Sequence, residues 1–95
     1  AIGGNSAFSQ TYTTIANGNW NTAATWQGGA IPPSTVTAAQ TVNIRHTVNY
    51  NTGNPLINNG TFRIQPVTGT TARLNVPTGI NVENTSTGKF YIIDT

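Results

Sequence analysis

Hydrophobic and polar residues alternate along much of the chain with a period of two, which is typical of half-buried β-strands. The clearest case is the segment 41–50, whose even positions form one largely apolar face: Val42, Ile44, His46, Val48 and Tyr50. The same pattern predicts strands at residues 61–65, 72–76, 80–83 and 89–93. Turns rich in Pro, Gly, Asn and Thr separate these segments, so the pattern predicts an all-β protein.

The alternation also predicts which side chains face the core. In the C-terminal half the inward set comprises Phe62, Ile64, Leu74, Val76, Ile80, Val82, Phe90 and Ile92. The charged side chains of the strands fall on the opposite phase: Arg45, Arg63, Arg73, Glu83 and Lys89. We therefore expect one face of each strand to be buried and the other to meet solvent.

The N-terminal part follows a different pattern. Residues 8–14 alternate as a strand after a Gly-rich lead, and no partner for this strand is evident from the sequence. We therefore divide the chain into an N-terminal arm, residues 1–15, and a single all-β domain, residues 16–95. The start of that domain is dense in Gly and Asn and has room for at most one helical turn, around residues 22–25.

Two architectures fit this train of strands. A degenerate repeat, in which residues 57–64 return as 82–92 with three residues inserted, favours a short β-solenoid-like fold of stacked coils. The short turns after Val76 and Glu83 could equally close the antiparallel hairpins of a two-sheet, jelly-roll-like β-sandwich. Either architecture would carry the N-terminal arm as an extension strand.

Composition excludes several classes of function. The 95 residues include 18 Thr and 13 Asn, and only 6% are charged, with no Cys or Met. Two acidic residues, Glu83 and Asp94, and one histidine are too few for most catalytic or metal-binding constellations, so we expect no enzyme, catalytic residue, metal or cofactor. Four scattered cations do not form a nucleic-acid footprint, and no apolar run is long enough to span a membrane.

The segment Gly18-Asn19-Trp20-Asn21, Thr25-Trp26, Gly28-Gly29 and Pro32, followed by residues 42–48, resembles the opening of β-solenoid domains in secreted bacterial surface proteins. The resemblance covers about residues 16–92. It implies that the tryptophan segment is a cap on the first coil and that the protein is extracellular. A surface of neutral hydroxyl and amide groups is also typical of extracellular fibres and adhesins. A secreted chain would then begin, in its mature form, at Ala1.

Several single residues invite a functional interpretation. His46 shares a face with Ile44 and Val48, so we expect a histidine at the edge of the core that bonds to a backbone carbonyl. Trp20 and Trp26 could stack on sugar rings, but filling the core or capping the coil is the favoured role. Two sequons make Asn59 and Asn84 candidate glycosylation sites, since both lie on or beside predicted turns.

The sequence carries few of the charges and prolines that normally keep exposed strand edges apart. The last predicted strand, residues 90–93, is apolar on both faces, and the arm offers a strand without a partner. We therefore predict a structural subunit of an extracellular filament, a homopolymer joined by β-strand pairing. The donated strand comprises Phe8, Gln10, Tyr12 and Thr14, and the receiving edge comprises Phe90, Tyr91, Ile92 and Ile93. The expected partners are identical subunits, and covalent or bound glycans are further candidates.

The alternative is a carbohydrate-binding or adhesin cap module of a secreted surface protein. In that case Trp20 or Trp26 would stack on a polysaccharide. Loss of glycan binding in Trp20→Ala, with the fold retained, would favour this alternative over the filament.

Overall fold

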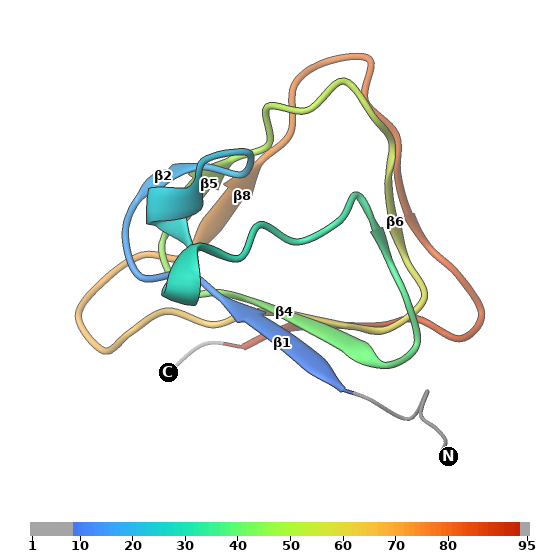
Figure 1. The fold of residues 1–95 in the computed structure, drawn as a ribbon, viewed down its shortest axis with the longest axis horizontal. Helices are drawn as coiled ribbons and strands as arrows, with labels where there is room; N and C mark the ends of the chain where they lie inside the picture. Colours follow the sequence, from blue (N-terminus) through green and yellow to red (C-terminus); the bar gives the residue numbers. More distant parts are fainter. Residues whose placement is uncertain (1–8, 94–95) are drawn as a thin grey trace.

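A computed structural model describes residues 9–93, and it shows an all-β solenoid in which the chain winds around a roughly triangular cross-section (Figure 1). Three sheets form the sides of the triangle, and successive coils stack along the view direction of Figure 1. Each complete coil contributes one strand to each sheet. A fourth strand in one sheet begins a further coil.

Sheet A has four strands, β1 (Gln10–Thr13), β4 (Gln40–Ile44), β7 (Thr61–Ile64) and β10 (Lys89–Ile92). Sheet B contains β2 (Gly18–Asn19), β5 (Thr47–Asn49) and β8 (Arg73–Asn75). Sheet C contains β3 (Thr35–Val36), β6 (Leu56–Asn58) and β9 (Val82–Asn84). Two short 3₁₀ helices, η1 (Ala23–Thr25) and η2 (Gln27–Gly29), lie between β2 and β3 in the first coil.

The solenoid prediction is confirmed, and the β-sandwich alternative is not supported. All neighbouring strands named above pair in parallel, in contrast to the hairpins that a sandwich would need. The turns after Val76 and Glu83 do not reverse the chain. They turn it through a corner from one sheet to the next, from β8 to β9 and from β9 to β10. Short turns therefore fit either architecture, and only the pairing distinguishes them.

The predicted strand 41–50 is two strands, because the chain turns a corner at Arg45 and His46 between β4 and β5. The inward phase continues through the corner, so Ile44 and Val48 are both buried on the same side of the chain. The side-chain alternation was thus correct, although the strand is not continuous. The helical turn at residues 22–25 is confirmed by η1, whereas η2 and the short strands β2, β3 and β6 were not predicted.

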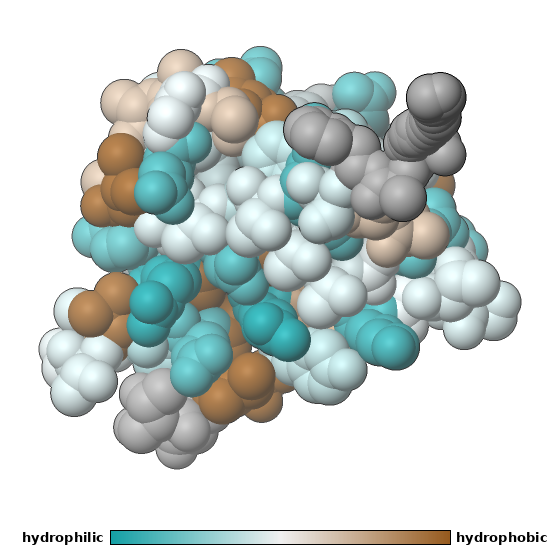
Figure 2. All heavy atoms as spheres, turned by 60° about the horizontal axis from the view of Figure 1, so that its bottom comes forward, coloured by the Kyte–Doolittle hydropathy of each residue, from teal (hydrophilic) through white to brown (hydrophobic). Residues whose placement is uncertain are grey.

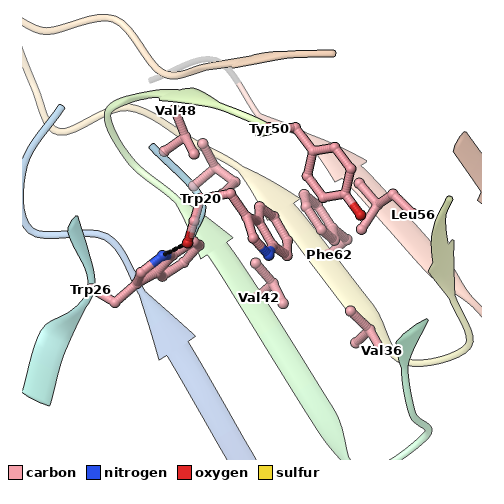
Figure 3. Close-up of a cluster of buried hydrophobic side chains, with 9 residues drawn as sticks. Trp20, Trp26, Val36, Val42, Val48, Tyr50, Leu56 and Phe62 are labelled. Carbon is pink, nitrogen blue, oxygen red and sulfur yellow. Dashed lines mark hydrogen bonds between the residues drawn. The ribbon is translucent and has the colours of Figure 1, made fainter. Parts of the chain in front are cut away.

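The core is an aromatic and aliphatic cluster inside the triangle (Figure 3). Trp20 lies at its centre and makes edge-to-face contacts with Trp26 and Tyr50, at centroid distances of 5.3 and 5.1 Å. The other buried members are Val36, Val42, Ile44, Val48, Leu56 and Phe62. Edge-to-face pairs of this kind add to the stabilisation that comes from burying the rings.

Aromatic rings also stack along the solenoid axis. Phe62 and Phe90 occupy the same register position on β7 and β10, and their rings are parallel within 3° at a centroid distance of 5.0 Å. Trp20 stacks on the same Phe62 ring at 6.1 Å. The second half of the repeat that suggested coils corresponds to real stacking, in which Thr61 lies beside Lys89 and Phe62 beside Phe90. Its first half is one residue out of register, because Ile57 pairs with Glu83 and not with Val82.

Candidate functional site

The two ends of the coil stack differ, and the first end is closed by the tryptophan segment. Trp26 donates its indole N–H to the carbonyl oxygen of Trp20 at 2.7 Å (Figure 3), and Trp20 donates to the carbonyl of Pro32 at 3.1 Å. The backbone of Ile15 bonds to Thr25, which ties the start of the first coil to this segment. The chain after η2 then crosses the mouth of the triangle towards β3 (Figure 1).

At the other end the inward side chains lose their cover. Ile44, Ile64 and Ile92 share one register position, and their exposure rises from 0% for Ile44 to 79% for Ile92. Leu56 and Val82 form a second such pair, with exposures of 1% and 49%. The prediction that Val82 and Ile92 are buried is therefore wrong. Their phase is inward, but no further coil covers them within residues 9–93.

Among residues 9–93, the backbone groups at the two outer edges of sheet A have no partner, and they follow a regular phase. On β1 the amides of Gln10 and Thr14 donate towards β4, so strand alternation turns the amides of Thr11 and Thr13 to the free edge. On β10 the amides of Lys89 and Ile93 donate towards β7, which turns the amides of Phe90 and Ile92 to the opposite free edge.

The structure places most of the predicted assembly residues on these two edges. Gln10 and Tyr12 lie on β1, and Thr14 follows it, while Phe8 is outside the described residues. Phe90, Tyr91 and Ile92 lie on β10, and Ile93 follows it. The arm differs from its description as a strand without a local partner, because β1 pairs with β4 of the same chain, with Tyr12 beside Val42. Its outer edge is the one left for another strand.

The two tryptophans and the histidine that the sequence singled out lie in the core or at its edge. Trp20 and Trp26 are 0% and 1% exposed, so in this structure neither indole offers a face to a sugar ring. His46 is half-buried at the corner between β4 and β5. Its Nδ1 lies 2.8 Å from the hydroxyl of Thr14, in place of the backbone carbonyl that was expected.

Both sequon asparagines lie at the corner between sheets C and A. Asn84 is exposed, but its amide nitrogen donates to the carbonyl of Gly88 at 3.1 Å and its oxygen accepts from Asn58 at 2.9 Å. Asn59 is half-buried and accepts a hydrogen bond from the hydroxyl of Thr85 at 2.6 Å. A glycan on Asn84 would replace one of the two hydrogens of that amide nitrogen, and the bond to Gly88 would then need the hydrogen that is left.

Within residues 9–93, no group of three or more His, Cys, Asp or Glu side chains is placed to bind a metal ion. The described part of the chain also contains no helix with the length and apolar character needed to cross a bilayer. Comparison with protein-family models, with curated proteins and with solved structures finds no match to this chain.

Proposed function

We propose that the protein is a structural subunit of an extracellular filament, in which the β10 edge of one copy pairs with the β1 edge of the next. The observation that carries the proposal is the strand order of sheet A, β1-β4-β7-β10. It leaves the N-terminal and C-terminal strands at opposite edges of one parallel sheet. A second copy placed on β10 would continue the sheet in the same direction.

The register within the chain predicts the register between copies. Thr11, Thr41, Thr61 and Lys89 share one position across sheet A, and Tyr12, Val42, Phe62 and Phe90 share the next. Continued into a neighbouring copy, this places Lys89 beside Thr11 and Phe90 against the half-buried Tyr12 ring. The free amides then meet free carbonyls, because even-numbered residues of β10 and odd-numbered residues of β1 face the junction.

The energetic terms favour such a junction. Each intersubunit backbone hydrogen bond would contribute about 0.5–1.5 kcal/mol net. Covering Ile92 and Phe90 would add roughly 1.5–3 kcal/mol for each side chain that becomes fully buried. Strand β1 carries no charged residue, so Lys89 meets no like charge across the junction.

The extracellular assignment rests on composition and on the resemblance to solenoid domains of secreted surface proteins. The hydroxyl- and amide-rich surface has few charges to repel a second copy. The adhesin alternative loses its proposed sugar platform, since both indoles are buried. The filament is therefore the better-supported function, with β1 shared between its own subunit and the next rather than donated away.

Disulfide trapping tests the junction. The chain has no cysteine, so Thr11→Cys combined with Lys89→Cys introduces the only two thiols. Within one chain these positions are three strands apart, about 14 Å, too far for a disulfide, whereas in the proposed junction they are neighbours. Under mild oxidation we expect a covalent ladder of oligomers on a non-reducing gel, and filaments in negative-stain electron microscopy.

The matched control is Thr11→Cys with Tyr91→Cys, which is two residues out of register and should cross-link far less. A further variant, Thr11→Pro, removes an amide that faces only the free edge, so it should fold but not polymerise, whereas Thr11→Ser should polymerise normally. The proposal is refuted if the unmodified protein sediments as a monomer at millimolar concentration. Equal cross-linking of both cysteine pairs would refute the register.

A further inference from the structure

A polar hollow on the outer face of sheet A is the feature that the filament does not use. It measures about 390 Å³ and is lined by Thr13, Asn43, Ile44, Arg45, Arg63 and Gln65. Figure 2 looks towards this side of the molecule, where hydrophilic side chains gather around a depression and hydrophobic atoms lie beside it. The hollow extends over β1, β4 and β7, the first three strands of sheet A, as far as the corner at Arg45.

Its two guanidinium groups are held in place by neighbouring groups. Arg45 is half-buried, and its Nε and Nη2 donate to the carbonyls of Gln65 and Pro66, both at 3.4 Å. Arg63 lies over the Tyr91 ring, with its Cζ atom 5.6 Å from the ring centroid. A guanidinium has five N–H donors, so both side chains keep donors for a ligand after these contacts. These contacts also restrict both side chains before a ligand binds, which lowers the entropic cost of binding.

No acidic side chain described in residues 9–93 neutralises this pair. The single carboxylate side chain in that range is Glu83, which lies on β9 in sheet C, on another side of the solenoid. Two cations beside one hollow therefore attract an anion. The planar donor fork of arginine matches the oxygen atoms of a carboxylate or sulfate group in a bidentate geometry.

The rest of the lining consists of hydroxyl and amide groups. Asn43 donates to the hydroxyl of Thr13 at 3.2 Å, which orients its amide oxygen as an acceptor, and Gln65 adds a second amide. Such groups pair with sugar hydroxyls. A volume of 390 Å³ is near the lower end of small-ligand sites, which suits one or two sugar rings. A nucleic acid would need a longer run of cations than this face offers.

We propose that this hollow binds an acidic saccharide, with Arg45 and Arg63 on its carboxylate or sulfate group and Asn43, Gln65 and Thr13 on its hydroxyl groups. The site is complete within one chain, so it does not depend on the filament. In a filament it would recur once per subunit and bind a polysaccharide at many points.

Isothermal titration calorimetry on the purified chain tests the proposal with four probes: a galacturonic acid trisaccharide, a sulfated disaccharide, a neutral galactose trisaccharide and inorganic sulfate. We expect at least one acidic saccharide to bind about tenfold or more tightly than the neutral sugar and than free sulfate, since charged hydrogen bonds are the stronger ones. Preference for the carboxylated or the sulfated probe identifies the anionic group. Equal affinity for inorganic sulfate would overturn the saccharide assignment.

Arg63→Gln and Arg45→Gln should each weaken binding of the acidic saccharide about tenfold. The matched control is Arg73→Gln, which removes the same charge from an exposed position on β8 in sheet B and should change affinity less than twofold. Arg45 also bonds to the loop at Pro66, so a thermal unfolding measurement is needed to check that Arg45→Gln keeps its fold. Arg63 is exposed, and Arg63→Gln is therefore the decisive variant. Equal weakening by Arg63→Gln and Arg73→Gln would show a non-specific charge effect and overturn the proposal.

Discussion

Asn58 stabilises the corner between sheets C and A with an amide that is 2% exposed. Its nitrogen donates to Asn84 of the next coil at 2.9 Å and to the carbonyl of Lys89 at 3.0 Å, and its oxygen accepts from the backbone of Gly60 at 3.1 Å. The side chain therefore connects one coil to the next and fixes the turn that follows it. A buried amide contributes in this way only when its bonds are satisfied.

Replacing Asn58 with Ala should lower the free energy of unfolding by about 2–3 kcal/mol, since it removes three bonds and leaves the buried backbone N–H of Gly60 unpaired. Urea denaturation followed by tryptophan fluorescence measures the change. Asn75→Ala is the control, because Asn75 bonds to Asn49 of the coil before it at an exposed position. It should cost about 0.5 kcal/mol. Equal losses in the two variants would contradict the role assigned to burial.

Residue-scale sequence reasoning succeeded where burial follows alternation. The charges of Arg63, Arg73 and Lys89 were predicted to point outward, and all three side chains are exposed. It could not predict that Asn58 would be buried, because asparagine is normally read as a turn residue. Nor could it predict the hollow at Arg45 and Arg63, which are 18 positions apart in the sequence and meet only when β4 and β7 pair.

At the scale of elements, the corners determine the fold as much as the strands do. Gly60 lies in the turn between β6 and β7, where a Cβ atom would collide with the carbonyl oxygens of Thr37 and Gln40 in the preceding coil. Gly88 is in the equivalent turn before β10, and a Cβ there would meet the carbonyl of Asn58. Glycine at this corner therefore allows consecutive coils to approach closely.

Gly60→Ala should destabilise the protein by roughly 2 kcal/mol or more, because the obstacle is backbone and cannot move aside. Gly53→Ala is the matched control, since nothing lies within 4 Å of a Cβ at that position. That substitution should leave the thermal midpoint unchanged or slightly raised, because it reduces the freedom of the unfolded chain. Calorimetry compares the two. A similar effect of both substitutions would show that the coils can separate without cost.

Element prediction was limited by strand length and by sequence separation. β2 and β3 have two residues each, too few for any period to be visible. The corner at Arg45 and His46 was hidden because the inward phase passes through it without interruption. Parallel pairing could not be inferred locally either, since Gln10 pairs with Gln40 and Thr47 with Arg73, far along the chain.

At the scale of the whole molecule, stability should fall from the first coils to the last. Rings and aliphatic side chains of β4 and β5 are covered on both sides by neighbouring coils, whereas Leu74, Val82 and Phe90 are covered on one side. In a stack of repeats each unit is stabilised by its neighbours, so the terminal unit with fewer contacts opens first.

Amide hydrogen exchange checks this gradient on the monomer at low concentration. We expect the slowest exchange in β4 and β5 and faster exchange, by about tenfold or more, in β8 and β9. The comparison needs amides that are hydrogen-bonded across different pairs of coils, such as Trp20 to Asn49 between the first two coils and Arg73 to His46 between the second and third. On polymerisation the free-edge amides of Phe90 and Ile92 on β10 should become protected. Uniform protection along the monomer would contradict the gradient.

The parallel, in-register arrangement of sheet A has a consequence for any assembly built from it. A parallel sheet extended through β10 and β1 has no two-fold axis that could exchange its ends. One tip would always present the tryptophan-sealed coil, and the other the bare isoleucine and valine side chains. Such a fibre would be vectorial: its tips would elongate at different rates, and a molecule that recognises one tip could set the direction in which it grows.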